Sequence, residues 1–207
     1  MSKRRLPIIV ERGLGEIRTF RISLERELVS KVLQDGPLSC KSGCSNCCLH
    51  PRYISPFEGV LLYRALVEKG RWTPSMQARV SDHANLTTRL ALTVWYLSAI
   101  PCPVLDESTG KCLAYDARPT MCRLVLSRQP PDDCHPHRYD RNIAFPMLNV
   151  KEALEKYHTF EQRIHRSHGI KITVATISNS LLLAAKIHSG EIDLNRIDLE
   201  QFLLLRG

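Results

Sequence analysis

The segment Cys40-Lys41-Ser42-Gly43-Cys44-Ser45-Asn46-Cys47-Cys48 places four thiols within nine residues. If the segment is helical, the four cysteines share one face, because positions i, i+4, i+7 and i+8 point the same way. Its glycine, serine and asparagine argue equally for a turn, and either conformation brings several sulfur atoms together. Such thiols suit soft ions, namely zinc in a tetrahedral site or iron in a cluster. The adjacent pair Cys47-Cys48 cannot easily direct both sulfurs at one ion, which favours a polynuclear cluster or two sites.

A second group of cysteines lies between residues 101 and 146, where prolines are frequent and no helical period is sustained. Residues 102–115 predict a short hairpin around a turn-rich loop, with Cys102 and Cys112 across from one another. Arg118-Pro119 then turns the chain so that Cys122 can return. We predict that the metal ligands are Cys40, Cys44, Cys47, Cys48, Cys102, Cys112, Cys122 and Cys134. The spacing leaves open whether these thiols form two four-thiolate sites or one cluster with spare thiols.

Several histidines lie near the cysteines or on the helical flanks. His50, His135 and His137 are close enough in sequence to replace a cysteine as ligand, although a solvated or locally bonded imidazole is favoured for each. Cys134 is the cysteine most open to such replacement, because it lies in a polar loop. Three histidines farther along the chain are predicted to lie on a helix surface: His158, His165 and His168.

Helices are predicted on both sides of this centre. Apolar spacing and capping residues indicate helices over residues 17–35, 55–69, 73–99, 149–168 and 173–188, with a short final helix from residue 198. The second of these opens with Ser55-Pro56-Phe57-Glu58, a capping-box spacing with proline at the first helical position. The predicted fold class is therefore mainly α, with a small irregular, cysteine-rich centre that contains a short β-hairpin. We expect an N-terminal helical segment (1–37), a cysteine-cluster metal-binding domain with inserted helices (38–140) and a C-terminal helical segment (141–207).

Length and composition suit one ordinary domain with its own core. The chain has 207 residues, of which 43% are hydrophobic. The apolar run at residues 6–10 is too short for a signal-peptide core, and no stretch approaches the length of a membrane span. We therefore expect a cytoplasmic protein with no membrane span. Thiols stay reduced in the cytosol, so eight clustered cysteines indicate metal ligation or redox chemistry rather than a structural disulfide framework.

The partner is not identified by the composition. A net charge of +8 is compatible with nucleic acid, but metal-bound thiolates would cancel part of it. Aromatic residues make up 6% of the chain and are scattered, so no base-stacking platform is evident. Nucleic acid is disfavoured as a partner without being excluded, and a protein partner remains open.

The cysteine segments resemble the YkgJ-type cysteine-cluster family, also called the CxxCxxCC zinc- or iron-chelating domain. The resemblance rests on Cys40 to Cys48, on Pro101-Cys102-Pro103-Val104-Leu105-Asp106, and on the run from Lys111 to Arg123, which is similar to a C-x-x-Y-x-x-R-P-x-x-C-R signature. It covers about residues 38–135. Three residues separate Cys40 from Cys44, where the family name has two.

The resemblance implies metal binding through an iron–sulfur cluster or zinc. For the other signature residues we expect Pro119 to fix a turn, Tyr115 to pack the hairpin, and Arg118 and Arg123 to stabilise thiolate charge or form surface salt bridges. Some larger relatives resembling this domain are flagellin lysine methylases associated with an iron–sulfur centre.

The sequence leaves three alternatives to a simple metal-binding protein. A metal-dependent, methylase-like modifying enzyme would need a cofactor site, and no G-x-G-x-x-G fingerprint follows a strand here. An adaptor scaffolded by zinc would bind a protein or nucleic acid. Thiol–disulfide exchange through Cys44-x-x-Cys47 is the least supported, because no βαβ pattern surrounds the motif.

Overall fold

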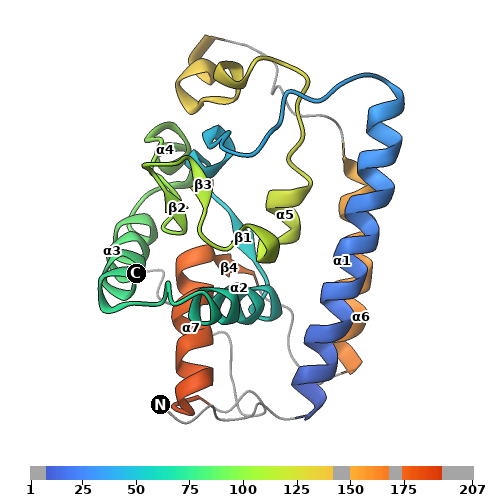
Figure 1. The fold of residues 1–207 in the computed structure, drawn as a ribbon. Helices are drawn as coiled ribbons and strands as arrows, with labels where there is room; N and C mark the ends of the chain where they lie inside the picture. The colour runs from blue at the N-terminus through green and yellow to red at the C-terminus, as the bar shows by residue number, and fades with distance from the viewer. Residues whose placement is uncertain (1–7, 142–149, 168–173, 193–207) are drawn as a thin grey trace.

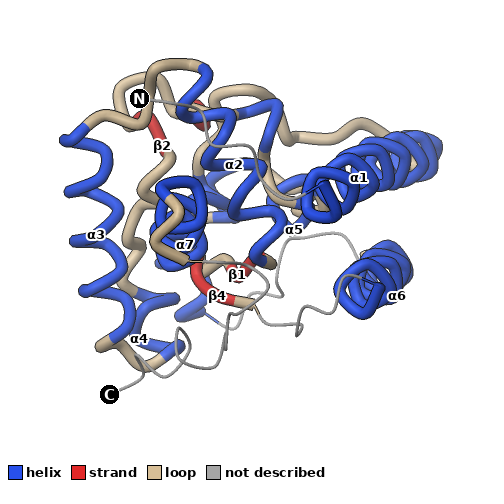
Figure 2. Tube along the Cα trace, turned by 90° about the horizontal axis from the view of Figure 1, so that it is seen from below, coloured by secondary structure: helices blue, strands red, loops and turns tan. Residues whose placement is uncertain are grey.

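The computed structural model describes residues 8–141, 150–167 and 174–192, and within them the fold is mainly helical. Two long helices, α1 (Ile8–Gln34) and α6 (Lys151–Ser167), lie side by side along one flank (Figures 1 and 2). Helices α2 (Pro56–Glu68), α3 (Pro74–Thr88) and α7 (Ile177–Ser189) pack together as a second group, and α1 also contacts α2. The mainly α fold class predicted from the sequence is confirmed.

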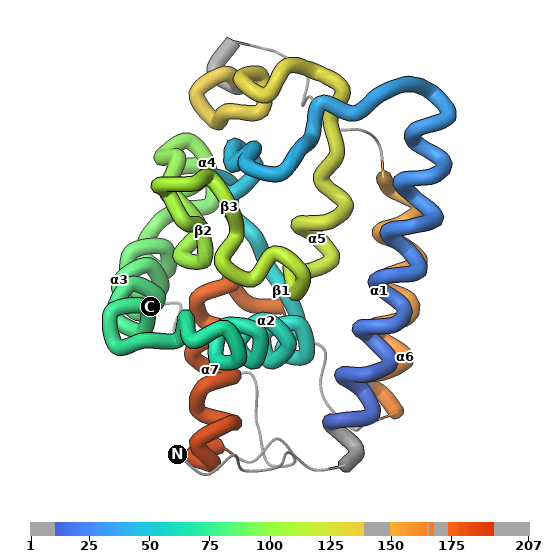
Figure 3. Tube along the Cα trace, in the orientation of Figure 1, coloured from blue at the N-terminus to red at the C-terminus, as the bar shows by residue number. Residues whose placement is uncertain are grey.

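The cysteine-bearing segments lie between these helix groups at one end of the molecule, as the tube in Figure 3 shows. Strands are short here: β1 (Tyr53–Ile54) pairs antiparallel with β4 (Ala175–Thr176), and β2 (Leu105–Asp106) pairs antiparallel with β3 (Lys111–Cys112). The remaining helical pieces are short, with three to six residues each. They are η1 (Asn46–Leu49), η2 (Tyr115–Ala117), η3 (Pro131–Cys134), η4 (Pro136–Arg141), α4 (Leu92–Leu97) and α5 (Thr120–Arg123). The predicted irregular centre with its hairpin is therefore present.

One continuous hydrophobic core supports the centre. Fully buried Ile17, Leu66 and Leu181 come from α1, α2 and α7, and the half-buried Cys102, Cys112 and Cys122 pack against the same cluster. A smaller cluster joins α1 to α6 through Leu24, Leu124, Ala153 and Tyr157. The division of the chain into three segments stays a prediction, and the predicted final helix from residue 198 lies outside the described residues.

Two helix predictions need correction. The first helix begins at Ile8 rather than near residue 17, because Leu14 is buried with Ile17 on the same face. The helix predicted over 73–99 is two helices, α3 and α4. Hydroxyls at the end of α3 bond back to carbonyls one turn earlier (Thr88 Oγ1 to Ala84 O, 2.7 Å), and the last turn closes with short-range bonds at residues 89 and 90. The irregular apolar spacing of this stretch had masked the break.

Candidate metal centre

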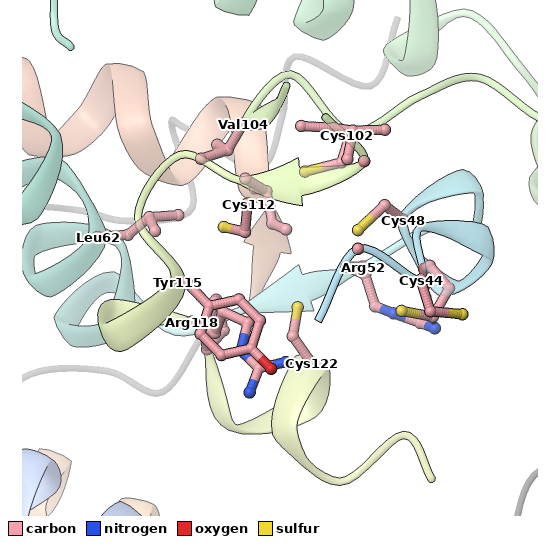
Figure 4. Close-up of a pocket in the computed structure, with 16 residues that line it drawn as sticks. Cys44, Cys48, Arg52, Leu62, Cys102, Val104, Cys112, Tyr115, Arg118 and Cys122 are labelled. Atoms are coloured by element: carbon pink, nitrogen blue, oxygen red, sulfur yellow. Dashed lines mark hydrogen bonds between the residues drawn. The ribbon is translucent and has the colours of Figure 1, made fainter. Parts of the chain in front are cut away.

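A largely enclosed cavity of about 50 Å³ separates the two cysteine blocks. Six of the eight cysteines line it: Cys44, Cys47, Cys48, Cys102, Cys112 and Cys122. Figure 4 shows Cys48, Cys102, Cys112 and Cys122 arranged around one space from different segments, with the sulfur atoms of Cys48, Cys102 and Cys122 directed toward it. A cavity of this size accommodates at least one water-sized body and therefore a metal ion. Residues far apart in sequence thus meet at one thiol-lined space.

The first block reaches the cavity through a turn and η1. The amide of Cys44 donates to Lys41 O (3.1 Å), and Cys48 N donates to Ser45 O (2.8 Å). Of the two conformations that the sequence left open, the structure has a turn, followed by one turn of 3₁₀ helix that carries Cys47 and Cys48. Both of these adjacent residues line the cavity, and their thiols are hydrogen-bonded to each other.

The hairpin brings in the second block with a register different from the predicted one. Leu105, not Cys102, stands opposite Cys112. Cys102 lies before the strand because its amide donates to Cys48 O (2.8 Å) and its carbonyl accepts from Leu105 N (2.9 Å). Those two bonds tie Cys102 to the first cysteine block and turn the chain before β2 begins. The predicted pairing is wrong, although both cysteines still line one cavity.

Two glycines let the blocks approach closely. Gly43 and Gly110 both have positive φ (91° and 66°), and a Cβ on Gly110 would lie 2.6 Å from Gly43 O. No side chain fits in that contact. Since both glycines line the cavity, this backbone contact sets its width at the hairpin tip.

Cys122 enters on α5 after the turn predicted at Pro119. Pro119 caps α5 with φ −56° and ψ 156°, and its carbonyl accepts from Cys122 N (3.0 Å). From the other side, Glu58 of α2 accepts a hydrogen bond from Thr120 N (2.6 Å). The first turn of α5, and with it Cys122, is thereby anchored to α2.

Burial favours the protonated form of three cavity thiols, those of Cys102, Cys112 and Cys122. Burial raises the pKa of Cys102 to about 12, and burial likewise raises the pKa values of Cys112 and Cys122. The hydrogen bond from Cys48 lowers the pKa of Cys47 and raises that of Cys48. Metal binding at these thiols would therefore release protons and depend on pH.

Two arginines line the cavity. Arg52 donates to Cys47 O (3.2 Å). The hydrogen bond with Cys48 is the largest effect on the pKa of Cys47, and burial is the largest effect on the pKa values of Cys102 and Cys122. The charge of Arg52 makes a smaller contribution that lowers all three pKa values. Arg118 stacks its guanidinium over Tyr115 at 3.6 Å from the ring centre and lies 3.7 Å from Glu25. Its buried Nε has no hydrogen-bond partner among the described residues. Both cations can offset thiolate charge.

The arginine predictions are met in part. Arg118 lies at the cavity as expected, whereas Arg123 turns away from it, pairs with Glu25 and donates to Arg118 O (2.8 Å). Arg123 is only 9% exposed, so its ion pair is buried rather than at the surface. Arg52 was missed, and its place four residues after Cys48 was the available signal. Tyr115 packs over Arg118 beside the hairpin.

Cys40 and Cys134 lie outside the cavity lining. Ser127 N donates to Cys40 Sγ (3.2 Å), and the side chain of Ser127 is hydrogen-bonded to Cys134. His50 is buried, and its Nε2 lies 2.8 Å from Cys134 O, so this nitrogen is engaged by the backbone. The rings of His135 and His137 stack edge to face at 4.6 Å.

The donor set has not converged on a single point. Across residues 8–141, 150–167 and 174–192, no three His, Cys, Asp or Glu side chains are arranged to hold one metal ion as they stand. None of the helices in those ranges is both long and apolar enough to cross a membrane.

One family model matches this chain. It is that of the CxxCxxCC family, described as a "putative zinc- or iron-chelating domain", and it covers residues 39–143, which is half of the chain and includes all eight cysteines. The chain belongs to the CxxCxxCC family. Membership supports metal binding by zinc or iron and leaves the metal open. Neither the curated proteins nor the solved structures contain a match.

Proposed function

We propose that this CxxCxxCC protein holds an iron–sulfur cluster in the thiol cavity, with Cys48, Cys102, Cys112 and Cys122 as its ligands. The observation that carries the proposal is the arrangement of these thiols around one enclosed space (Figure 4). Four cysteine thiolates are the usual ligand set of such clusters.

The spread of the thiols favours a cluster over a single zinc ion in the cavity. In a tetrahedral zinc site every sulfur lies about 2.3 Å from one ion, so the sulfur atoms nearly touch each other. The described side chains include no such convergent group. The backbone cannot readily close the gap, because Cys102 is tied to Cys48 O (2.8 Å) and Cys122 lies on the anchored α5. An iron–sulfur cluster contains several metal atoms, so it can reach thiols that are too far apart to bind one ion.

Charge and burial fit the same group. Four thiolates around a cluster leave net negative charge in a buried site, which is costly without nearby cations. Arg52 and Arg118 line the cavity, and the unpartnered Nε of Arg118 is available to a sulfur acceptor. The surrounding side chains of Leu62, Val104 and Ile177 exclude water.

An iron–sulfur cluster supplies one-electron chemistry and cross-links the segments that bind it. The segments here are loops and single turns with little regular structure of their own, so the cluster would stabilise the centre of the fold. Tyr115 lines the cavity and is 39% exposed, so the cavity lies one side chain from solvent. That position suits electron exchange with a partner.

The test compares wild-type protein with one ligand variant and one control, all purified without oxygen. Cys122→Ser removes a proposed ligand, whereas Ser45→Ala alters a neighbouring residue whose side chain makes no capping hydrogen bond. We expect visible thiolate-to-iron absorption, with iron and sulfide, in wild type and Ser45→Ala and its loss in Cys122→Ser. A colourless wild type that binds zinc without sulfide, or a Cys122→Ser variant with an unchanged cluster, would refute the proposal.

A further inference from the structure

Glu25 of α1 lies between two arginines of the cysteine-bearing region. One carboxylate oxygen forms an ion pair with Arg123, and the other lies 3.7 Å from Arg118 Nη2. Glu25 is half-buried and Arg123 is buried, so these contacts are partly shielded from water. Glu25 also lies outside residues 39–143, the part of the chain that the family model covers. The first helix therefore reaches the arginine beside the cavity through a residue that the family match does not include.

Arg118 is the member of this trio that lines the thiol cavity. Its guanidinium stacks on the ring of Tyr115, 3.6 Å from the ring centre (Figure 4). Its buried Nε has no hydrogen-bond partner among the described residues. The 3.7 Å contact with Glu25 is longer than a hydrogen bond, so it does not fix the guanidinium by itself. The same cation is thus open to Glu25 on one side and to negative charge in the cavity on the other.

Glu25 also controls the backbone that carries Arg118. Its partner Arg123 donates from Nε to Arg118 O (2.8 Å) and from Nη2 to Asp116 O. Arg123 does not line the cavity, so its contacts with this segment hold the main chain and do not touch the thiols. Because Glu25 pairs with Arg123, one carboxylate anchors the segment and faces the guanidinium that the segment presents.

We propose that Glu25 is a positioning residue that sets the reduction potential of the cluster through Arg118. The inference rests on the proposed function. Reduction adds one electron, supplied by an external one-electron donor, and makes the buried site more negative. A nearby cation favours that state, so Arg118 should raise the potential. The Glu25 carboxylate offsets part of the charge of Arg118 and draws the guanidinium toward α1, and both effects should lower the potential.

The first experiment measures the reduction potential of the cluster by titration with dithionite and redox mediators under argon. Arg118→Gln should lower the ratio of reduced to oxidised cluster at a fixed potential by about tenfold, which is about 59 mV for one electron. Glu25→Gln should raise that ratio by about three- to tenfold. The matched control is Glu27→Gln, which removes a carboxylate of the same helix that pairs with Lys156 instead and should change the ratio by less than about twofold. Equal potentials in wild type and Glu25→Gln would overturn the inference.

A double variant separates positioning from a general change of structure. If Glu25 acts through Arg118, Glu25→Gln should change the ratio by less than about twofold in the Arg118→Gln background. An effect of Glu25→Gln that is as large without Arg118 as with it would overturn the inference. Glu25→Asp keeps the charge on a shorter side chain and serves if the Gln variant does not fold. It should shift the potential in the same direction as Glu25→Gln, and an unchanged potential would contradict the proposal.

Iron and sulfide per chain are measured in every variant, so that potentials are compared only between proteins with the same cluster content. A wild-type protein without iron and sulfide would refute the proposed function and this inference with it. An intact cluster whose potential does not respond to Glu25 would overturn the inference alone.

Discussion

Two acidic side chains, one on α2 and one on α6, are buried close enough to interact electrostatically. Glu58 and Glu161 are 1% and 2% exposed, and Glu161 accepts a hydrogen bond from Tyr157 (2.7 Å). Burial, followed by the charge of Glu58, raises the pKa of Glu161 from 4.5 to about 7. The buried Arg21 is close enough to interact electrostatically with Glu58 and Tyr157. This cluster supports the helix that anchors Cys122, so its stability bears on the metal centre.

The substitution Glu161→Gln should remove a pH-dependent loss of stability. Below pH 4.5, Glu161 is protonated in both the folded and the unfolded chain, so its ionisation does not lower the free energy of unfolding. As pH rises above 4.5, the unfolded chain releases its proton while the folded chain keeps it, so stability falls until about pH 7 and then stays level. The shift between the two pKa values corresponds to a loss of about 3 kcal/mol.

The assay is urea denaturation of wild type and variant at pH 5 and pH 8 with the same metal content. The free energy of unfolding of the Gln variant, relative to that of wild type, should be about 2 kcal/mol higher at pH 8 than at pH 5. The reason is that only the wild type has a carboxyl group at this position that ionises on unfolding. Glu155→Gln on the same helix is the matched control, since that carboxylate is exposed and its pair with Lys151 is weak. Parallel stability profiles for wild type and Glu161→Gln would refute the reasoning.

Three further predictions concern the cavity. Gly110→Ala should destabilise the fold by about 1–3 kcal/mol more than Gly70→Ala and should lower the metal content. Both glycines have positive φ, but only a Cβ at residue 110 would press on Gly43 O. Equal unfolding free energies of the two variants would count against the close contact. Arg52→Gln should weaken metal binding by about 10–100-fold in a chelator competition at neutral pH, whereas the exposed Arg71→Gln should not, and equal affinities would exclude the charge effect. Removing the metal should open the two cysteine blocks to limited proteolysis while the α2–α7 core stays protected; identical digestion with and without metal would show that the metal does not hold these segments.

Capping residues within the sequence predicted where α2 begins. Ser55 caps α2 as expected, with its hydroxyl accepting from Glu58 N (3.4 Å). The other half of the capping box is absent, because the Glu58 carboxylate accepts from Thr120 N instead of from the cap (2.6 Å). The spacing identified Glu58 as a polar partner near the cap. It could not show that Glu58 would instead accept a hydrogen bond from Thr120, which is distant in sequence.

For the candidate metal ligands, too, the sequence predicted the residues but not the long-range contacts that position them. The number and clustering of cysteines predicted a shared thiol site, and six of them do line one cavity. Their grouping depends on contacts across the chain, such as Ser127 to Cys40 (3.2 Å) and Cys102 N to Cys48 O (2.8 Å). The hairpin register failed for the same reason, since a bond to the first block decides where Cys102 lies.

The most direct test of the account is elemental analysis of iron, zinc and acid-labile sulfide on wild-type protein purified without oxygen. The account predicts iron with matching sulfide, bound by the thiols of the cavity. Folded protein that contains neither element, even after anaerobic reconstitution, would contradict the metal assignment and return the eight cysteines to thiol chemistry.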